Sequence, residues 1–187
     1  RGIVRMKIVW ETPTAMSTQA QTQSGLHQDP GNLLCVLRRH AEECPDRTAF
    51  VHLDDGSPDH PSLTYAQVDR RARAIAGRLQ NTGLAGQCVL LVYPPGLDFI
   101  TAFLGCLYAG CVAVPTSPPH RHRVADRFQA VAADAGARVA LSTAAAAAQF
   151  QAMTETGKSG RAATSSGIPW LPTDEIADIL AERWNEP

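Results

Sequence analysis

Two kinds of hydrophobic pattern alternate along the chain. Short continuous apolar runs, such as Cys88–Val92 and Val139–Ser142, are typical of strands buried on both faces of a parallel sheet. Between them, apolar residues recur every three or four positions, as in Tyr65–Asn81, which is the spacing of a helix with one buried face. Strands that alternate with longer helices predict an α/β fold, with a mainly parallel sheet flanked by helices.

The stretch Val89–Pro119 organises the predicted fold. It begins as a buried strand, turns at a Pro-Pro-Gly sequence, continues as an apolar helix, and becomes a second buried strand that stops at Pro115. We expect Gly105 to let the helix pack closely against the sheet, and Gly110 to end the helix. The two glycines do not form a phosphate loop, because no Lys-Ser or Lys-Thr follows them. The apolar part is too short for a membrane span.

The other predicted elements follow from start and stop signals on either side of this stretch. In chain order we expect a helix from 29–31 to Cys44, a strand 48–53, a turn at 54–56, a strand 62–64, a helix 65–81, a helix 124–135, a strand 139–142, an alanine-rich helix from Thr143 to 153, a strand 169–171 and a helix 174–183.

The helix predicted at 65–81 has the clearest division between an apolar and a polar face. Thr64 is its expected N-cap, and Gly83 its expected stop. The positions expected to be buried are Val68, Ala72, Ile75 and Leu79, and those expected to face solvent are Asp69, Arg70, Arg71 and Arg73.

Composition narrows the class of protein. The chain has 17 Lys and Arg against 18 Asp and Glu, a balance that argues against nucleic acid as a partner. Its 5 cysteines are odd in number and form no CxxC pair. We therefore expect free thiols, mostly buried, in a cytoplasmic protein, and neither a zinc site nor a disulfide framework.

The first 28 residues are predicted to lie outside the ordered domain. Residues 1–28 show no sustained periodicity, and we expect them to form a disordered tail. The first residue is Arg1, and Met16 begins a stretch rich in Ser, Thr and Gln. Met16 is therefore a candidate start, which would make the residues before it non-native. We expect the ordered domain to span 29–187.

Three groups of residues are candidates for chemistry. Tyr93-Pro94-Pro95-Gly96 follows the central strand, and ligands of open α/β sheets bind just beyond strand carboxyl ends. The alternative is a rigid turn, with Asp98 favoured by the helix dipole.

The other two groups lie in predicted loops. His120-Arg121-His122-Arg123 is either an anion site or a solvated loop. Asp54, Asp55, Asp59 and His60 suggest metal ligands, but a solvated turn between two strands accounts for them better. No Ser/His/Asp, Cys/His or paired-carboxylate arrangement follows from the spacing. We therefore assign no catalytic, cofactor-binding or metal-binding residue.

Four segments resemble the N-terminal part of the fatty acyl-AMP ligases, which belong to the adenylate-forming superfamily. Tyr93–Phe99, with the sequence YPPGLDF, resembles these ligases more than their relatives. Ser62–Gln80 and Leu107–Pro115 resemble the first two conserved cores of the superfamily, and Trp170–Ile176 resembles the segment before its phosphate loop. The resemblance extends from Asn32 to Pro187.

The resemblance implies a two-step reaction for the complete enzyme. A fatty acid reacts with ATP, with Mg²⁺ offsetting the phosphate charge, to give an acyl-adenylate. The acyl group then passes to the phosphopantetheine thiol of an acyl carrier protein, which feeds a polyketide or lipopeptide synthase. The resemblance also implies that this chain is a partial N-terminal subdomain of the adenylate-forming fold.

No residue of the chain matches the family's active site. The phosphate loop, the metal-binding Glu and the catalytic Lys of the family would lie beyond Pro187, and 164–167 (Thr-Ser-Ser-Gly) precedes the Trp170–Ile176 segment rather than following it. We therefore expect the chain to be inactive alone and to bind neither ATP nor Mg²⁺ tightly. The alternatives are a fragment of an acyl-CoA synthetase or amino-acid adenylation domain, and a non-catalytic α/β binding module.

Overall fold

A computed structural model of the chain describes residues 32–53, 60–116, 123–156 and 168–187. The predictions for 1–28, for the helix entry at 29–31, and for Asp54, Asp55 and Asp59 lie outside these residues. None of the helices in the described ranges combines the length and hydrophobicity that a membrane span needs.

The centre of the fold is a parallel sheet of four strands in the order β4-β3-β5-β6. Its strands are β3 (Cys88–Val92), β4 (Val112–Thr116), β5 (Val139–Ser142) and β6 (Trp170–Pro172). A separate antiparallel pair is formed by β1 (Thr48–Val51) and β2 (Ser62–Thr64). The predicted parallel sheet is confirmed, and the predicted bounds of its strands differ from the observed ones by one residue at most.

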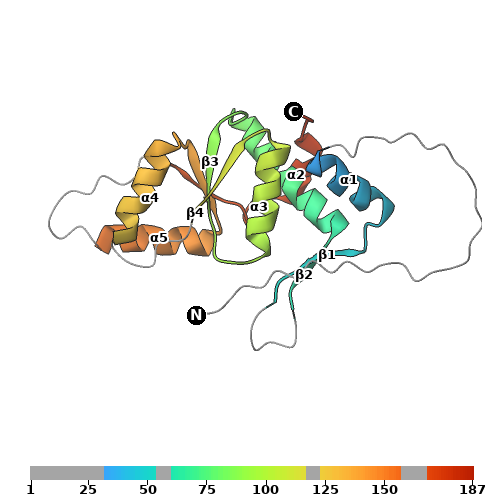
Figure 1. The fold of residues 1–187 in the computed structure, drawn as a ribbon, viewed down its shortest axis with the longest axis horizontal. Helices are drawn as coiled ribbons and strands as arrows, with labels where there is room; N and C mark the ends of the chain where they lie inside the picture. Colours follow the sequence, from blue (N-terminus) through green and yellow to red (C-terminus); the bar gives the residue numbers. More distant parts are fainter. Residues whose placement is uncertain (1–31, 54–59, 117–122, 157–167) are drawn as a thin grey trace, which may run out of the picture.

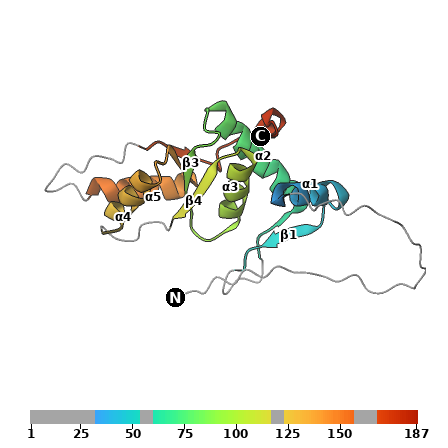
Figure 2. The same ribbon diagram turned by 45° about the horizontal axis from the view of Figure 1, so that its top comes forward.

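Helices cover both faces of the sheet (Figures 1 and 2). On one face lie α4 (Arg123–Asp134) and α5 (Ala144–Thr156). On the other lies α3 (Leu97–Tyr108), followed outward by α2 (Tyr65–Asn81) and α1 (Leu33–Glu43). Successive side chains of β3 point to opposite faces of the sheet, so this strand contributes to two cores. Val89 and Leu91 belong to the large core on the α2 and α3 side, and Leu90 and Val92 to the smaller core around Phe128.

The helix starts are fixed by side chains in the sequence. Thr64 and Gln67 form a capping box at α2, with hydrogen bonds of 3.3 Å and 2.9 Å to each other's backbone N–H groups. Thr143 accepts a hydrogen bond from the backbone N–H of Ala146, 3.2 Å away, at the start of α5. Thr64 was expected as the N-cap of α2, and Thr143 stands where the alanine-rich helix was expected to begin. At α1 the cap is Asn32, whose side chain accepts from the N–H groups of Leu34 and Cys35.

The strand β4 is an edge strand, and the prediction of a second strand buried like β3 was wrong. Val112 is 52% exposed, and among the strands of the described residues β4 has a hydrogen-bonded neighbour only on the β3 side. Pro115 lies within β4 because an edge strand tolerates the loss of one backbone N–H group. The apolar run alone did not reveal which strand would end the sheet.

Gly105 was expected to allow close packing of its helix against the sheet, but at this position the helix contacts α2 instead. A Cβ atom at this position would lie 2.7 Å from Cγ2 of Ile75 and 3.2 Å from the carbonyl oxygen of Ala72, both on α2. The missing side chain therefore allows α2 and α3 to approach each other. Gly110 has a φ of +69° just after α3, so its expected role in ending the helix is confirmed.

The predicted helix 174–183 is replaced by an irregular segment and a short 3-10 helix, η1 (Asp178–Arg183). The physical reason is that backbone carbonyl and side-chain groups at the start of this segment form hydrogen bonds with other elements of the fold. The carbonyl groups of Thr173 and Ile176 accept hydrogen bonds from Arg71, and the carboxylate of Asp174 accepts one from the N–H of Ala144. We call residues 173–187 the C-terminal strap.

All 5 cysteines are free thiols. Cys106 and Cys111 are buried as expected, Cys44 and Cys88 are half-buried, and Cys35 is exposed. Burial raises the pKa of the Cys111 thiol to about 11 and that of the Cys106 thiol further. These two thiols therefore stay protonated at neutral pH and act as apolar packing groups.

Candidate functional site

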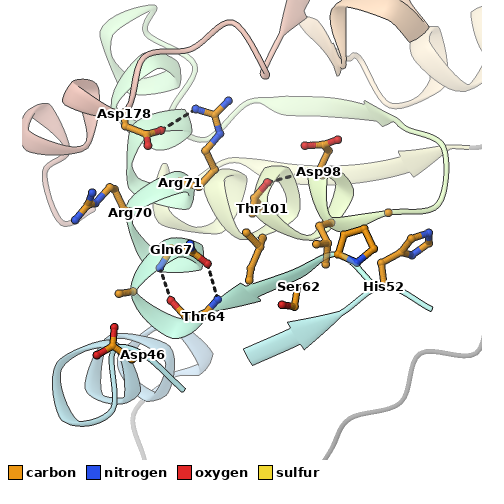
Figure 3. A pocket seen from close by; sticks show the side chains of 15 residues that line it. Asp46, His52, Ser62, Thr64, Gln67, Arg70, Arg71, Asp98, Thr101 and Asp178 are labelled. Carbon is orange, nitrogen blue, oxygen red and sulfur yellow. Dashed lines mark hydrogen bonds and ion pairs between the residues drawn. The ribbon is translucent and has the colours of Figure 1, made fainter. Parts of the chain in front are cut away.

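A cavity in the described part of the chain has a volume of about 920 Å³ and opens to solvent. It lies between the β1–β2 pair and the first turns of α2 and α3, as Figure 3 shows. The capping box of Thr64 and Gln67 forms one wall, and Gly96 and Asp98 at the start of α3 form another. The cavity is thus built by residues that end strands and begin helices.

The charged side chains around this cavity carry both signs. Asp46, Asp98 and Asp178 line it together with Arg70 and Arg71. Arg71 is paired with Asp178 at 2.9 Å, so its charge is already neutralised. Within the described residues, no group of three His, Cys, Asp or Glu side chains could hold a metal ion. The side chains present therefore do not fit Mg²⁺, and we assign no residue to it or to the ATP phosphates.

The turn after β3 begins with a buried tyrosine. The Tyr93 side chain is only 5% exposed, and its hydroxyl lies 2.8 Å from Oγ1 of Thr173. Burial raises the pKa of Tyr93 above its usual range, so the hydroxyl remains neutral. Tyr93 therefore anchors the end of β3 to the C-terminal strap, as the rigid-turn interpretation expects.

Tyr93 belongs to a polar network that joins the carboxyl ends of three strands. The hydroxyl of Ser142 donates to the carbonyl of Val92 at 2.6 Å, which ties β5 to β3. Thr173, just after β6, donates its N–H to the carbonyl of Ser142 at 2.8 Å and its hydroxyl to the same carbonyl at 3.3 Å. Sequence reasoning missed this network, because it depends on the order of the strands in the sheet.

A second buried polar cluster joins α2 to α3, and it corrects the expected polar face of α2. Asp69 is only 6% exposed; it accepts a hydrogen bond from the Tyr108 hydroxyl at 2.6 Å and pairs with Arg73 at 2.6 Å. Burial and the bond to Asp69 together raise the pKa of Tyr108. Arg71 and Arg73 are half-buried, and only Arg70 is exposed as predicted. The reason is that α2 is enclosed by α1, α3 and η1.

Most of the remaining candidate residues lie outside the part of the chain that the structure describes. Residues 120–122 and 164–167 lie outside the described ranges, and Arg123 is the first residue of α4. His60 is exposed, while its three predicted partners are among the residues not described. The described structure thus supplies a scaffold with two buried polar networks.

The geometry alone does not identify a protein family, and comparison with known proteins does. Residues 37–183 match the AMP-binding enzyme family. The chain belongs to that family. The match covers the sheet, the helices α2 to α5, the later part of α1 and the whole of η1.

The relatives of this AMP-binding chain include fatty-acid ligases, as the resemblance implied. It is 37% identical over 158 residues to the medium-chain-fatty-acid–[acyl-carrier-protein] ligase JamA of Moorena producens, a match that covers 83% of the chain and 26% of JamA. It is 36% identical over 150 residues to the mouse Disco-interacting protein 2 homolog A, and this match covers 79% of the chain and 10% of the mouse protein.

A solved structure has the same fold. The fatty acyl-adenylate ligase of Legionella pneumophila, crystallised with acyl adenylate and pyrophosphate, matches 82% of this chain with a TM-score of 0.70 and 31% sequence identity. The match covers 25% of the ligase chain. The AMP-binding chain therefore corresponds to about a quarter, or less, of the length of these relatives. The predicted partial adenylate-forming fold is confirmed.

Proposed function

We propose that residues 29–187 of this chain form the N-terminal scaffold of a fatty acyl-AMP ligase domain, and that this part stops before the phosphate loop. The observation that carries the proposal is the Legionella ligase, which holds an acyl adenylate and has this fold at 31% identity over 82% of the chain. The fatty-acid ligase JamA, at 37% identity, supports the same substrate class.

The reaction of the complete enzyme has two steps. A carboxylate oxygen of the fatty acid attacks the α-phosphorus of ATP; the new O–P bond forms as the bond to the bridging oxygen breaks, and pyrophosphate leaves. The thiolate of a carrier-protein phosphopantetheine then attacks the acyl carbon, and AMP leaves with the carboxylate oxygen. We propose a cytoplasmic location for both steps, with an acyl carrier protein as acceptor.

The part played by this chain is structural. Its sheet and its two buried polar networks set the positions of strand ends and helix starts, and in its cavity Arg71 is already paired with Asp178. Catalysis requires donors and bases aimed at the reacting atoms. Because the described residues provide no such arrangement, we expect the reaction to depend on the rest of the ligase domain.

Product analysis of the complete protein tests the substrate class. The protein encoded by the whole reading frame is incubated with ATP and either a medium-chain fatty acid, a long-chain fatty acid or a mixture of amino acids, and adenylates are detected by mass spectrometry. We expect acyl-adenylate from the fatty acids only. Transfer to a carrier protein rather than to coenzyme A is expected in the second step. Aminoacyl-adenylate or acyl-CoA as the main product would instead indicate an adenylation domain or an acyl-CoA synthetase.

One relative favours a second candidate function. The 36% identical mouse protein is named for an interaction rather than for a ligase activity. A non-catalytic binding module with this fold is therefore the alternative. The same experiment separates the two, because a binding module gives no adenylate with any carboxylic acid.

A further inference from the structure

We draw no further inference here: the strongest candidate, the open cavity between the β1–β2 pair and the first turns of α2 and α3, is lined by charged side chains of both signs, and nothing in the described part of the structure shows which ligand or partner occupies it.

Discussion

Replacing Asp69 by alanine is expected to lower the free energy of unfolding by about 3–5 kcal/mol. The Asp69 carboxylate is buried and satisfies both the Tyr108 hydroxyl and the Arg73 guanidinium at 2.6 Å. Its removal leaves the Tyr108 hydroxyl without an acceptor and the Arg73 guanidinium without its counter-charge. Arg73 Nε is already buried without a hydrogen-bond partner in the described structure, so the guanidinium would then lack its main partner as well. Unpaired buried polar groups are among the most destabilising defects in a core.

Urea unfolding followed by tryptophan fluorescence measures this loss, and two further variants apportion it. Tyr108→Phe removes one bond to the carboxylate and should cost about 1.5–3 kcal/mol. Glu43→Ala, at an exposed carboxylate of α1, is the control and should change the stability by less than about 0.5 kcal/mol. A loss for Asp69→Ala no larger than that for Glu43→Ala would contradict the role given to this cluster.

Replacing Gly105 by alanine is expected to cost about 1–3 kcal/mol, although alanine is the better helix former by about 1 kcal/mol. The added Cβ would lie 2.7 Å from Cγ2 and 2.8 Å from Cβ of Ile75. Because one of these atoms is next to the α2 backbone, a change of rotamer does not relieve the contact. The helices α2 and α3 must move apart, and both form the large core.

Gly96→Ser provides the matched control for Gly105→Ala in the same helix. Gly96 is the N-cap residue of α3, and no atom lies within 4 Å of a Cβ placed there. Serine is a favoured N-cap residue, so this variant should unfold at the same or a higher urea concentration. If Gly105→Ala proved as stable as Gly96→Ser, the close approach of α2 and α3 at Gly105 would not be what limits the size of that residue.

The sequence predicted best those features that depend on near neighbours in the chain. The N-cap role of Thr64 and the buried stripe from Val68 to Leu79 need only helical spacing to be recognised. The continuous apolar run Cys88–Val92 correctly indicated a central parallel strand. In each case the physical cause lies within a few residues.

The features that were missed depend on which element packs against which. Asp69 was expected to face solvent because its neighbours on the helix are arginines, but α2 is enclosed on several sides. Gly105 was expected to touch the sheet, but α2 lies there instead. The residues after Pro172 have a helical sequence pattern, but their backbone groups bond to Arg71, about 100 positions earlier, which no local pattern reveals.

The most direct test of the central claim is ATP–pyrophosphate exchange in the presence of a fatty acid, measured side by side for this 187-residue chain and for the protein of the whole reading frame. We expect exchange by the complete protein, and none above the enzyme-free background by the chain alone. Fatty-acid-dependent exchange by the chain alone would contradict the assignment of a scaffold without catalytic residues. Absence of exchange from the folded complete protein would contradict the assignment to a fatty acyl-AMP ligase.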